Sequence, residues 1–169
     1  SLGTIIGFAR TGNNPLLGLI SAGFITIIRQ TPLLLQLMFW YFVGFLGLKD
    51  NVLIQIKDIF IISNQGIELS GFNLSSEFSA LLLGLSIFAS AYIAEVIRGG
   101  ILSVPRGQWE AYRSLGLSER KGLISIIIPQ ALPAIIPGLT SQYLNLAKNS
   151  TLAIAVGYSD IYAINDTII

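Results

Sequence analysis

The sequence contains no cysteine and no histidine. Without these side chains the chain can form no Ser-His-Asp or Cys-His pair, no HExxH zinc site, no CxxC redox pair and no structural zinc cluster. These absences exclude intramembrane proteolysis of the serine-histidine or metal-dependent type. The sequence therefore predicts no catalytic residue, no metal ligand and no cofactor, and an enzyme is the least favoured class of function.

Charged side chains are also scarce. They make up 11% of the chain, whereas a soluble domain carries roughly 25%. Hydrophobic residues make up 53%, and the mean hydropathy is +0.72. Because a soluble domain of 169 residues could not bury so much apolar surface, we expect the chain to lie in a lipid bilayer. No basic stripe alternates with aromatic residues, so nucleic acid is not an expected partner.

The charge-free intervals predict an all-α fold, a polytopic bundle of membrane helices. A helix needs roughly 20 apolar residues to cross the hydrocarbon layer. The predicted spans are residues 1–9 (partial), 16–48 (long, or kinked at Pro32), 78–97 and 122–147. Between and beyond them lie an outer loop at 49–77, a loop at 98–121 and an outer segment at 148–169. The outer loop has apolar runs at 51–54 and 58–62 that indicate a short interfacial helix or strand. The chain starts with Ser1 and shows no signal peptide, so we expect an interior fragment.

Basic residues predict the orientation, because they accumulate in cytoplasmic loops close to the spans. Segments 10–29 and 95–121 together hold seven of the ten basic residues and three of the nine acidic residues. We therefore expect both segments on the cytoplasmic side.

The loop at 98–121 has the pattern of two helices separated by a glycine. Helix-forming residues run from 108 to 115, Gly116 suits a left-handed stop, and Ser118 can cap the next helix. A short amphipathic helix held between two spans is suited to docking a cytoplasmic partner.

This loop resembles that of the permease subunits of bacterial ATP-binding-cassette importers, in the branch for polar amino acids. The family pattern is Glu-Ala-Ala, three residues, Gly, nine residues, Ile, one residue, Leu-Pro. The matching positions are Glu110, Ala111, Gly116, Ile126 and Pro129, with Tyr112 in place of the second alanine and Ile128 in place of leucine. Tyr112 is expected to add bulk to a docking surface that is usually small. Residues 29–37, 91–100, 129–133 and 148–152 resemble the same branch, and the long outer loop is closest to the general amino acid permeases.

The resemblance implies part of a type I importer transmembrane domain in the bacterial inner membrane. Such a multi-pass subunit forms half of the pore, with a second permease subunit that is either identical or related. The implied partners are two cytoplasmic ATP-binding subunits and an extracytoplasmic amino acid-binding protein. The chain has no GxxxxGK[ST] loop of its own, so ATP hydrolysis belongs to the partners. The residues expected to couple to the ATPases are Glu110, Ala111, Tyr112, Arg113, Gly116, Ile126 and Pro129.

Polar residues inside the spans are candidates for lining a substrate path. We select Gln36, Ser90, Gln142, Asn145, Lys148 and Asn149. Two alternatives stay open: serine and threonine often bond only their own backbone, and Lys148 can be a headgroup anchor.

Three other features have both a structural and a functional interpretation. Glu95 and Arg98 form either an interfacial ion pair or part of a gate. Pro129, Pro133 and Pro137 recur every four residues, which indicates either a kink beside the pore or a moving gate. The aromatic run at residues 40–42 is typical of packing or of a membrane belt.

The alternative function is a secondary transporter or channel that needs no ATPase. Such proteins are expected to hold charges at mid-membrane, and the interiors of the predicted spans contain none.

Overall fold

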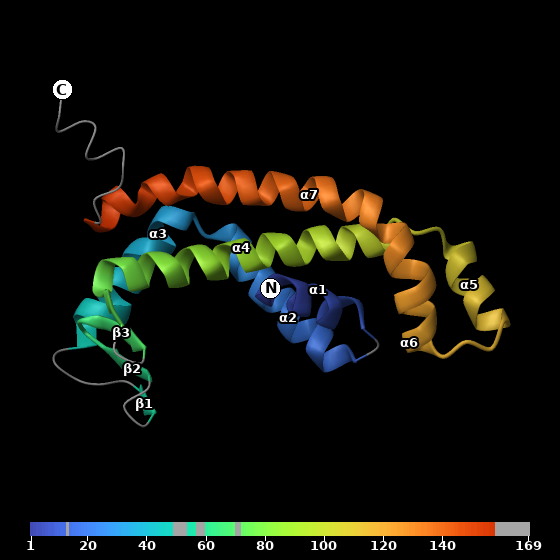
Figure 1. Ribbon diagram of the computed structural model, residues 1–169, viewed down its shortest axis with the longest axis horizontal. Helices are drawn as coiled ribbons and strands as arrows, with labels where there is room; N and C mark the ends of the chain where they lie inside the picture. Colours follow the sequence, from blue (N-terminus) through green and yellow to red (C-terminus); the bar gives the residue numbers. More distant parts are fainter. Residues whose placement is uncertain (13, 49–53, 57–59, 70–71, 158–169) are drawn as a thin grey trace. The chain divides into compact units, whose positions relative to one another are not determined.

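The computed structural model describes residues 1–12, 14–48, 54–56, 60–69 and 72–157 (Figure 1). Helices dominate these residues, which confirms the predicted all-α class, and one small sheet is added to them. The chain divides into two compact units. The first contains Ser1–Arg29 and Ala89–Asn145, and the second contains Gln30–Phe88 and the chain from Leu146 onward.

The core of the first unit lies among the C-terminal half of α4 (Ser76–Leu102), α5 (Arg106–Ser114), η3 (Leu123–Ile127) and the start of α7 (Ile128–Asn149). The short α6 (Glu119–Gly122) leads into η3, and α5 and α6 lie close together (Figure 1). The buried residues of this core are Ile93, Ile97, Ile101, Val104, Tyr112, Ile127, Ala131 and Ile135. One apolar cluster therefore holds the loop helices against the two long helices.

Helix α1 (Leu2–Thr11) packs on α4 through two glycines. Gly3 and Gly7 are buried, and they face one side of α1 because they are four residues apart. A Cβ at Gly7 would lie 2.9 Å from the carbonyl oxygen of Ala94, and one at Gly3 would lie 2.6 Å from that of Ser90. Only glycine allows this close approach of two helix backbones.

The chain leaves helical geometry at Thr31 and Pro32, where the sequence predicts a kink. Helix α2 (Pro15–Gln30) ends before them, and α3 (Leu33–Met38) begins after Pro32, which is extended with φ −60° and ψ 136°. Proline has no backbone N–H and disfavours helical geometry in the residue before it. The chain continues as a π-helix, η1 (Phe39–Phe45), and a 3-10 turn, η2 (Leu46–Leu48).

The predicted outer loop contains a four-stranded antiparallel meander in the order β1-β2-β3-β4. Its strands are β1 (Ile54–Ile56), β2 (Phe60–Ser63), β3 (Gly66–Leu69) and β4 (Phe72–Ser75). The sequence indicated a helix or strand at 51–54 and 58–62 and did not predict β3 or β4; of those runs, 51–53 and 58–59 lie outside the described residues. Ile67 opposes Leu74, and both pack near Ala80 of α4. Ser79 joins the sheet to α4, because its hydroxyl accepts from Ile67 N (3.1 Å) and donates to Leu74 O (3.2 Å).

Two helical stretches within the described residues are long and apolar enough to cross a membrane, Ser76–Leu102 and Glu119–Val156. The second is continuous through α6, η3, α7 and the 3-10 helix η4 (Ser150–Val156). The pair Pro15–Gln30 and Leu33–Phe45 meets the same criterion only as one broken span. The membrane boundaries of the four predicted spans stay predictions.

Candidate functional site

The loop between α4 and α7 folds as the sequence pattern predicts, into a helix, a left-handed glycine and a second helix. Helix α5 begins after Pro105, and its first turn closes with a bond from Gln108 N to Pro105 O (3.0 Å). Gly116 has φ +68°, and Leu117 N donates to Tyr112 O (3.2 Å). This is the bonding pattern of a helix that stops at a left-handed residue, a conformation that glycine adopts without steric cost.

Tyr112 is turned into the protein and is fully buried. Its ring lies against Gly122 of α6, where a Cβ would overlap it. Its ring centroid lies 6.1 Å from that of Trp109. The bulk of Tyr112 therefore fills the space between α5 and α6, and the expectation that it enlarges the docking surface is wrong.

Glu119 ties α6 back to α5. Its carboxylate accepts from the Tyr112 hydroxyl (2.6 Å) and from Arg113 Nε (3.0 Å). The bond to Glu119 and burial both raise the pKa of Tyr112, so the hydroxyl stays a donor at neutral pH. Ser118 caps α6 by accepting from Lys121 N (3.4 Å), as its place in the sequence predicts.

The outer surface of α5 carries both charge and apolar area. Glu110 and Ala111 are exposed, and Leu115 at the tip is 73% exposed. Beside them is an open hollow of about 460 Å³. Its lining consists of Leu102, Val104, Arg106, Trp109, Glu110 and Arg113. A surface that combines apolar side chains with charges of both signs is suited to docking another protein.

Ile126 and Pro129 lie where the loop passes into α7. Ile126 is half-buried against the core of the first unit, whereas Pro129 is exposed at the start of α7. Gln130 joins α7 to α5, because its side-chain amide donates to Gln108 Oε1 (3.1 Å); the amide also donates to Ile126 O (3.0 Å). Of the predicted coupling residues, Glu110, Ala111, Arg113 and Gly116 are exposed, and Tyr112 and Ile126 contribute to packing.

The predicted path residues are distributed over both units. In the first unit, Ser90 is buried, Gln142 is half-buried and Asn145 is exposed. In the second unit, Gln36 is buried and its amide donates to Thr31 Oγ1 (2.6 Å) and Thr31 O (3.1 Å). Lys148 is exposed and Asn149 is half-buried. Their role as a substrate path stays a prediction.

The Glu95–Arg98 pair is part of a larger cluster. Arg98 donates from Nη2 (2.9 Å) and Nε (3.2 Å) to Glu95, as its i,i+3 spacing predicts. Arg10 of α1 also binds Glu95, and Arg29 of α2 lies 3.7 Å from it. Sequence reasoning missed these two arginines as partners, because they are 85 and 66 positions away and only the fold brings them to α4.

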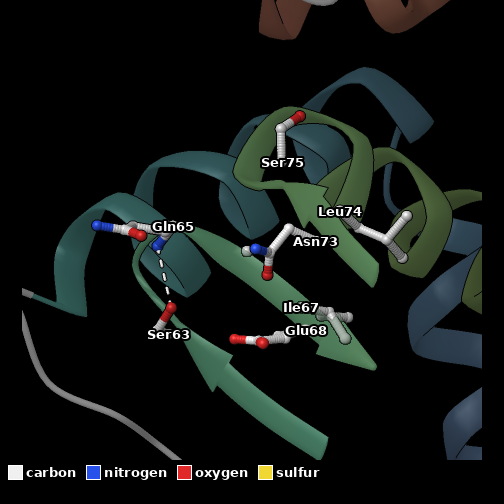
Figure 2. Close-up of a pocket in the computed structure, with 8 residues that line it drawn as sticks. Ser63, Gln65, Ile67, Glu68, Asn73, Leu74 and Ser75 are labelled. Carbon is white, nitrogen blue, oxygen red and sulfur yellow. Dashed lines mark hydrogen bonds between the residues drawn. The ribbon is translucent and has the colours of Figure 1, made fainter. Parts of the chain in front are cut away.

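The sheet of the second unit has a polar hollow of about 280 Å³ (Figure 2). Glu68 and Asn73 lie opposite each other on β3 and β4, and Gln65 N donates to Ser63 Oγ (3.3 Å). The other lining residues are Gly66, Ile67, Leu74 and Ser75. Within the same unit, Trp40 and Tyr41 pack beside the core of Phe45, Ile67 and Ala80, while Phe42 is half exposed.

Comparison with known proteins gives consistent matches. The chain is 34% identical to a putative amino-acid ABC transporter permease protein of Escherichia coli, YhdX, over 96% of this chain and 62% of that protein. It is 32% identical to the arginine transport system permease protein ArgU of Corynebacterium glutamicum, over 94% of this chain and 46% of that protein. It therefore spans less than two thirds of the length of these relatives.

A solved structure also matches, an amino acid ABC transporter crystallised with histidines. The TM-score is 0.75 at 31% identity, covering 99% of this chain and 67% of that chain. A family model matches residues 1–168. The chain thus belongs to the family described as binding-protein-dependent transport system inner membrane components.

Proposed function

We propose that the chain is part of the permease subunit of an ATP-driven amino acid importer and forms half of its translocation pore. The observation that carries this proposal is the outer surface of α5, where Glu110 and Ala111 are exposed while Tyr112 fixes the helix to the core of the first unit. The relatives are named as permeases for amino acids, which supports this substrate class.

In this proposal, α5 is the coupling helix. Glu110 pairs with a basic residue of an ATPase subunit, and the hollow beside it receives an apolar side chain of that subunit. Tyr112, Gly122 and Glu119 keep α5 and α6 together, so that α5 transmits force to α4 and α7 as a rigid piece. When ATP brings two ATPases together, paired coupling helices move and the spans rock between two gate positions.

The face of α7 that carries its prolines favours a position of this helix beside the pore or against a second subunit. Pro129, Pro133 and Pro137 are all exposed, and the core residues Ala131 and Ile135 lie on the other side of the helix. Each proline leaves the carbonyl four residues earlier without its helical donor, and in a bilayer such carbonyls need protein or water. A lipid-facing position would not satisfy them.

The remaining parts of the proposal follow from the family. The permease is a multi-pass protein of the bacterial inner membrane, and it works with a second permease subunit, two ATP-binding subunits and an extracytoplasmic amino acid-binding protein. Gln36, Ser90, Gln142, Asn145, Lys148 and Asn149 are the residues we propose for the amino acid path.

The test is reconstitution of the full-length permease with its ATPase and binding protein in vesicles. Amino acid uptake and ATP hydrolysis are measured for the wild type, Glu110→Lys and Arg120→Gln. We expect Glu110→Lys to lower uptake at least tenfold, because it reverses a charge at the docking surface, where a like-charge contact costs several kcal/mol. Arg120→Gln, which removes an exposed charge on α6, is the matched control and should retain most of the uptake.

Two results would contradict the proposal. Uptake that persists without the ATPase would favour the alternative, an ATPase-independent transporter or channel. Unchanged uptake and ATP hydrolysis in Glu110→Lys would remove α5 from the coupling role.

A further inference from the structure

The three arginines around Glu95 carry more positive charge than one carboxylate neutralises. They come from the last turns of α1 and α2 and from α4, and all belong to the first unit. Among the described residues, Glu95 is the carboxylate within ion-pair distance of Arg10, Arg29 and Arg98. The cluster therefore has a formal charge of about +2, counting one unit charge for each ionised group.

The number of hydrogen-bond donors also exceeds what Glu95 can accept. Each guanidinium group has five N–H donors, whereas one carboxylate has about four acceptor positions. Arg98 and Arg10 use part of this capacity, but Arg29 Nη1 lies 3.7 Å from Glu95 Oε2, beyond hydrogen-bond distance. A second anion with several oxygen atoms would fit the remaining donors, and phosphate has this geometry.

The cluster is also accessible. The side chains of Arg10, Arg98 and Arg29 are 26%, 31% and 44% exposed, whereas that of Glu95 is 17% exposed. The Arg29 guanidinium is held 5.1 Å from the ring centroid of Tyr92, which fixes the direction of its approach. An anion from outside can thus reach the arginines, whereas Glu95 is the more enclosed group.

The neighbouring surface of α2 is apolar. Leu16, Leu19, Ile20 and Ile27 of this helix are each more than 60% exposed. Such a surface beside cationic groups is what a lipid molecule contacts, with acyl chains on the apolar residues and the headgroup on the arginines. The predicted cytoplasmic side of the membrane is where basic residues meet anionic headgroups.

We propose that Arg10, Arg29 and Arg98 bind the phosphate of an anionic phospholipid, with Glu95 holding the three guanidinium groups in place. The headgroup chemistry is a phosphodiester with negative charge, and the lipid is bound between α1, α2 and α4 of the first unit. The inference uses the membrane family of the chain and does not depend on which amino acid it transports.

The experiment measures bound lipid on the complete transporter. The purified full-length complex is placed in nanodiscs of phosphatidylcholine with a minor fraction of phosphatidylglycerol, and retained lipid is counted by native mass spectrometry. The variants are Arg10→Gln, Arg29→Gln and the charge-conserving Arg29→Lys. Arg120→Gln is the matched control, because it removes one exposed positive charge away from the cluster.

We expect Arg10→Gln and Arg29→Gln each to lower phosphatidylglycerol retention about fivefold, because one basic residue near an anionic membrane contributes about 1 kcal/mol. Arg29→Lys should retain most of the binding, and Arg120→Gln should not change it. Equal retention in wild type, Arg10→Gln and Arg29→Gln would overturn the proposal.

Two further measurements use the wild type and do not depend on how the variants fold. Raising the salt concentration should release phosphatidylglycerol but not phosphatidylcholine, and a salt-independent preference would overturn the proposal. Inorganic phosphate distinguishes the source of the anion. Displacement of the lipid by millimolar phosphate would assign the cluster to free phosphate and overturn the lipid assignment.

Discussion

At the scale of single residues, α5 shows how one substitution changes its surroundings. The family pattern has alanine where this chain has Tyr112, and the larger ring fits because α6 presents Gly122 to it without a Cβ. The ring also brings a hydroxyl group that reaches Glu119. The absence of a side chain at Gly122 leaves room for the Tyr112 ring, so that the packing density between α5 and α6 is kept.

Gly122→Ala is predicted to destabilise the protein by about 1–3 kcal/mol, because the new methyl group overlaps the Tyr112 ring. The measurement is the thermal unfolding midpoint of the full-length protein in detergent. Gly107→Ala on α5 is the control, since a Cβ there meets nothing within 4 Å. In a Tyr112→Ala background, where the ring is absent, Gly122→Ala should cost less than it costs in the wild type. Equal costs in the two backgrounds would contradict the packing argument.

The Tyr112 hydroxyl also predicts a pH dependence. Its pKa is raised in the folded protein by the bond to Glu119 and by burial, relative to an unfolded value of about 10. The stabilisation is therefore complete below about pH 10 and is lost as the pH rises through the higher folded pKa. Unfolding midpoints measured on an alkaline pH series should converge for wild type and Tyr112→Phe. A gap of constant size up to the highest pH would show that the hydroxyl does not titrate in this way.

At the scale of elements, the glycines of α1 and the prolines of α7 act in opposite ways. Gly3 and Gly7 let α1 approach the backbone of α4, whereas Pro133 and Pro137 leave carbonyls of α7 that need another partner. The two glycines allow a close interface between α1 and α4 within the first unit. The two prolines mark a face that we assign to a pore or a second subunit.

Gly7→Ala is predicted to push α1 away from α4, since its Cβ would lie 2.9 Å from both Ala94 O and Ile97 Cβ. The loss should be about 1–3 kcal/mol, read as a lower unfolding midpoint. Gly18→Ala on α2 is the matched control, because nothing lies within 4 Å of its Cβ. That variant should be neutral or stabilising, since alanine favours helix by about 1 kcal/mol over glycine. Equal effects at both positions would argue against the close contact.

At the scale of the whole molecule, the two hollows belong to opposite predicted sides of the membrane. The charged hollow on α5 lies in the predicted cytoplasmic loop, and the polar hollow on the sheet lies in the predicted outer loop. The first is assigned to an ATPase in our proposal. In the same proposal, the second hollow lies on the side where an extracytoplasmic binding protein would dock.

The topology can be tested with introduced cysteines, because this chain contains none of its own. Asn73→Cys on β4 and Ser103→Cys after α4 are both at exposed positions. In cells with a permeable outer membrane, a membrane-impermeant maleimide should label Asn73→Cys directly and Ser103→Cys only after the inner membrane is opened. The full-length protein is used, with any cysteines outside this segment replaced. The reverse pattern would invert the orientation that the basic residues predict.

From the sequence alone we predict the membrane environment, the helical class and the helix-glycine-helix form of the loop at 98–121. These properties depend on composition and on local pattern: few charges, long apolar intervals, a left-handed glycine at Gly116 and a cap at Ser118. The break near Pro32 and the ion pair of Glu95 with Arg98 are local for the same reason. Each involves residues a few positions apart, whose geometry is set by the backbone itself.

The direction of the Tyr112 side chain and the arginine partners of Glu95 could not be predicted from the sequence and follow from the fold. The direction of Tyr112 depends on the way α6 packs on α5, with Gly122 and Glu119 beside the ring. The arginine contacts depend on helices that are distant in sequence, α1 and α2 with α4. The strands β3 and β4 were also missed, because short segments gain strand geometry from pairing with each other and from the bond of Ser79 to their backbone. The energies of such contacts depend on which residues pack together in the fold. A local sequence pattern does not specify these packing partners.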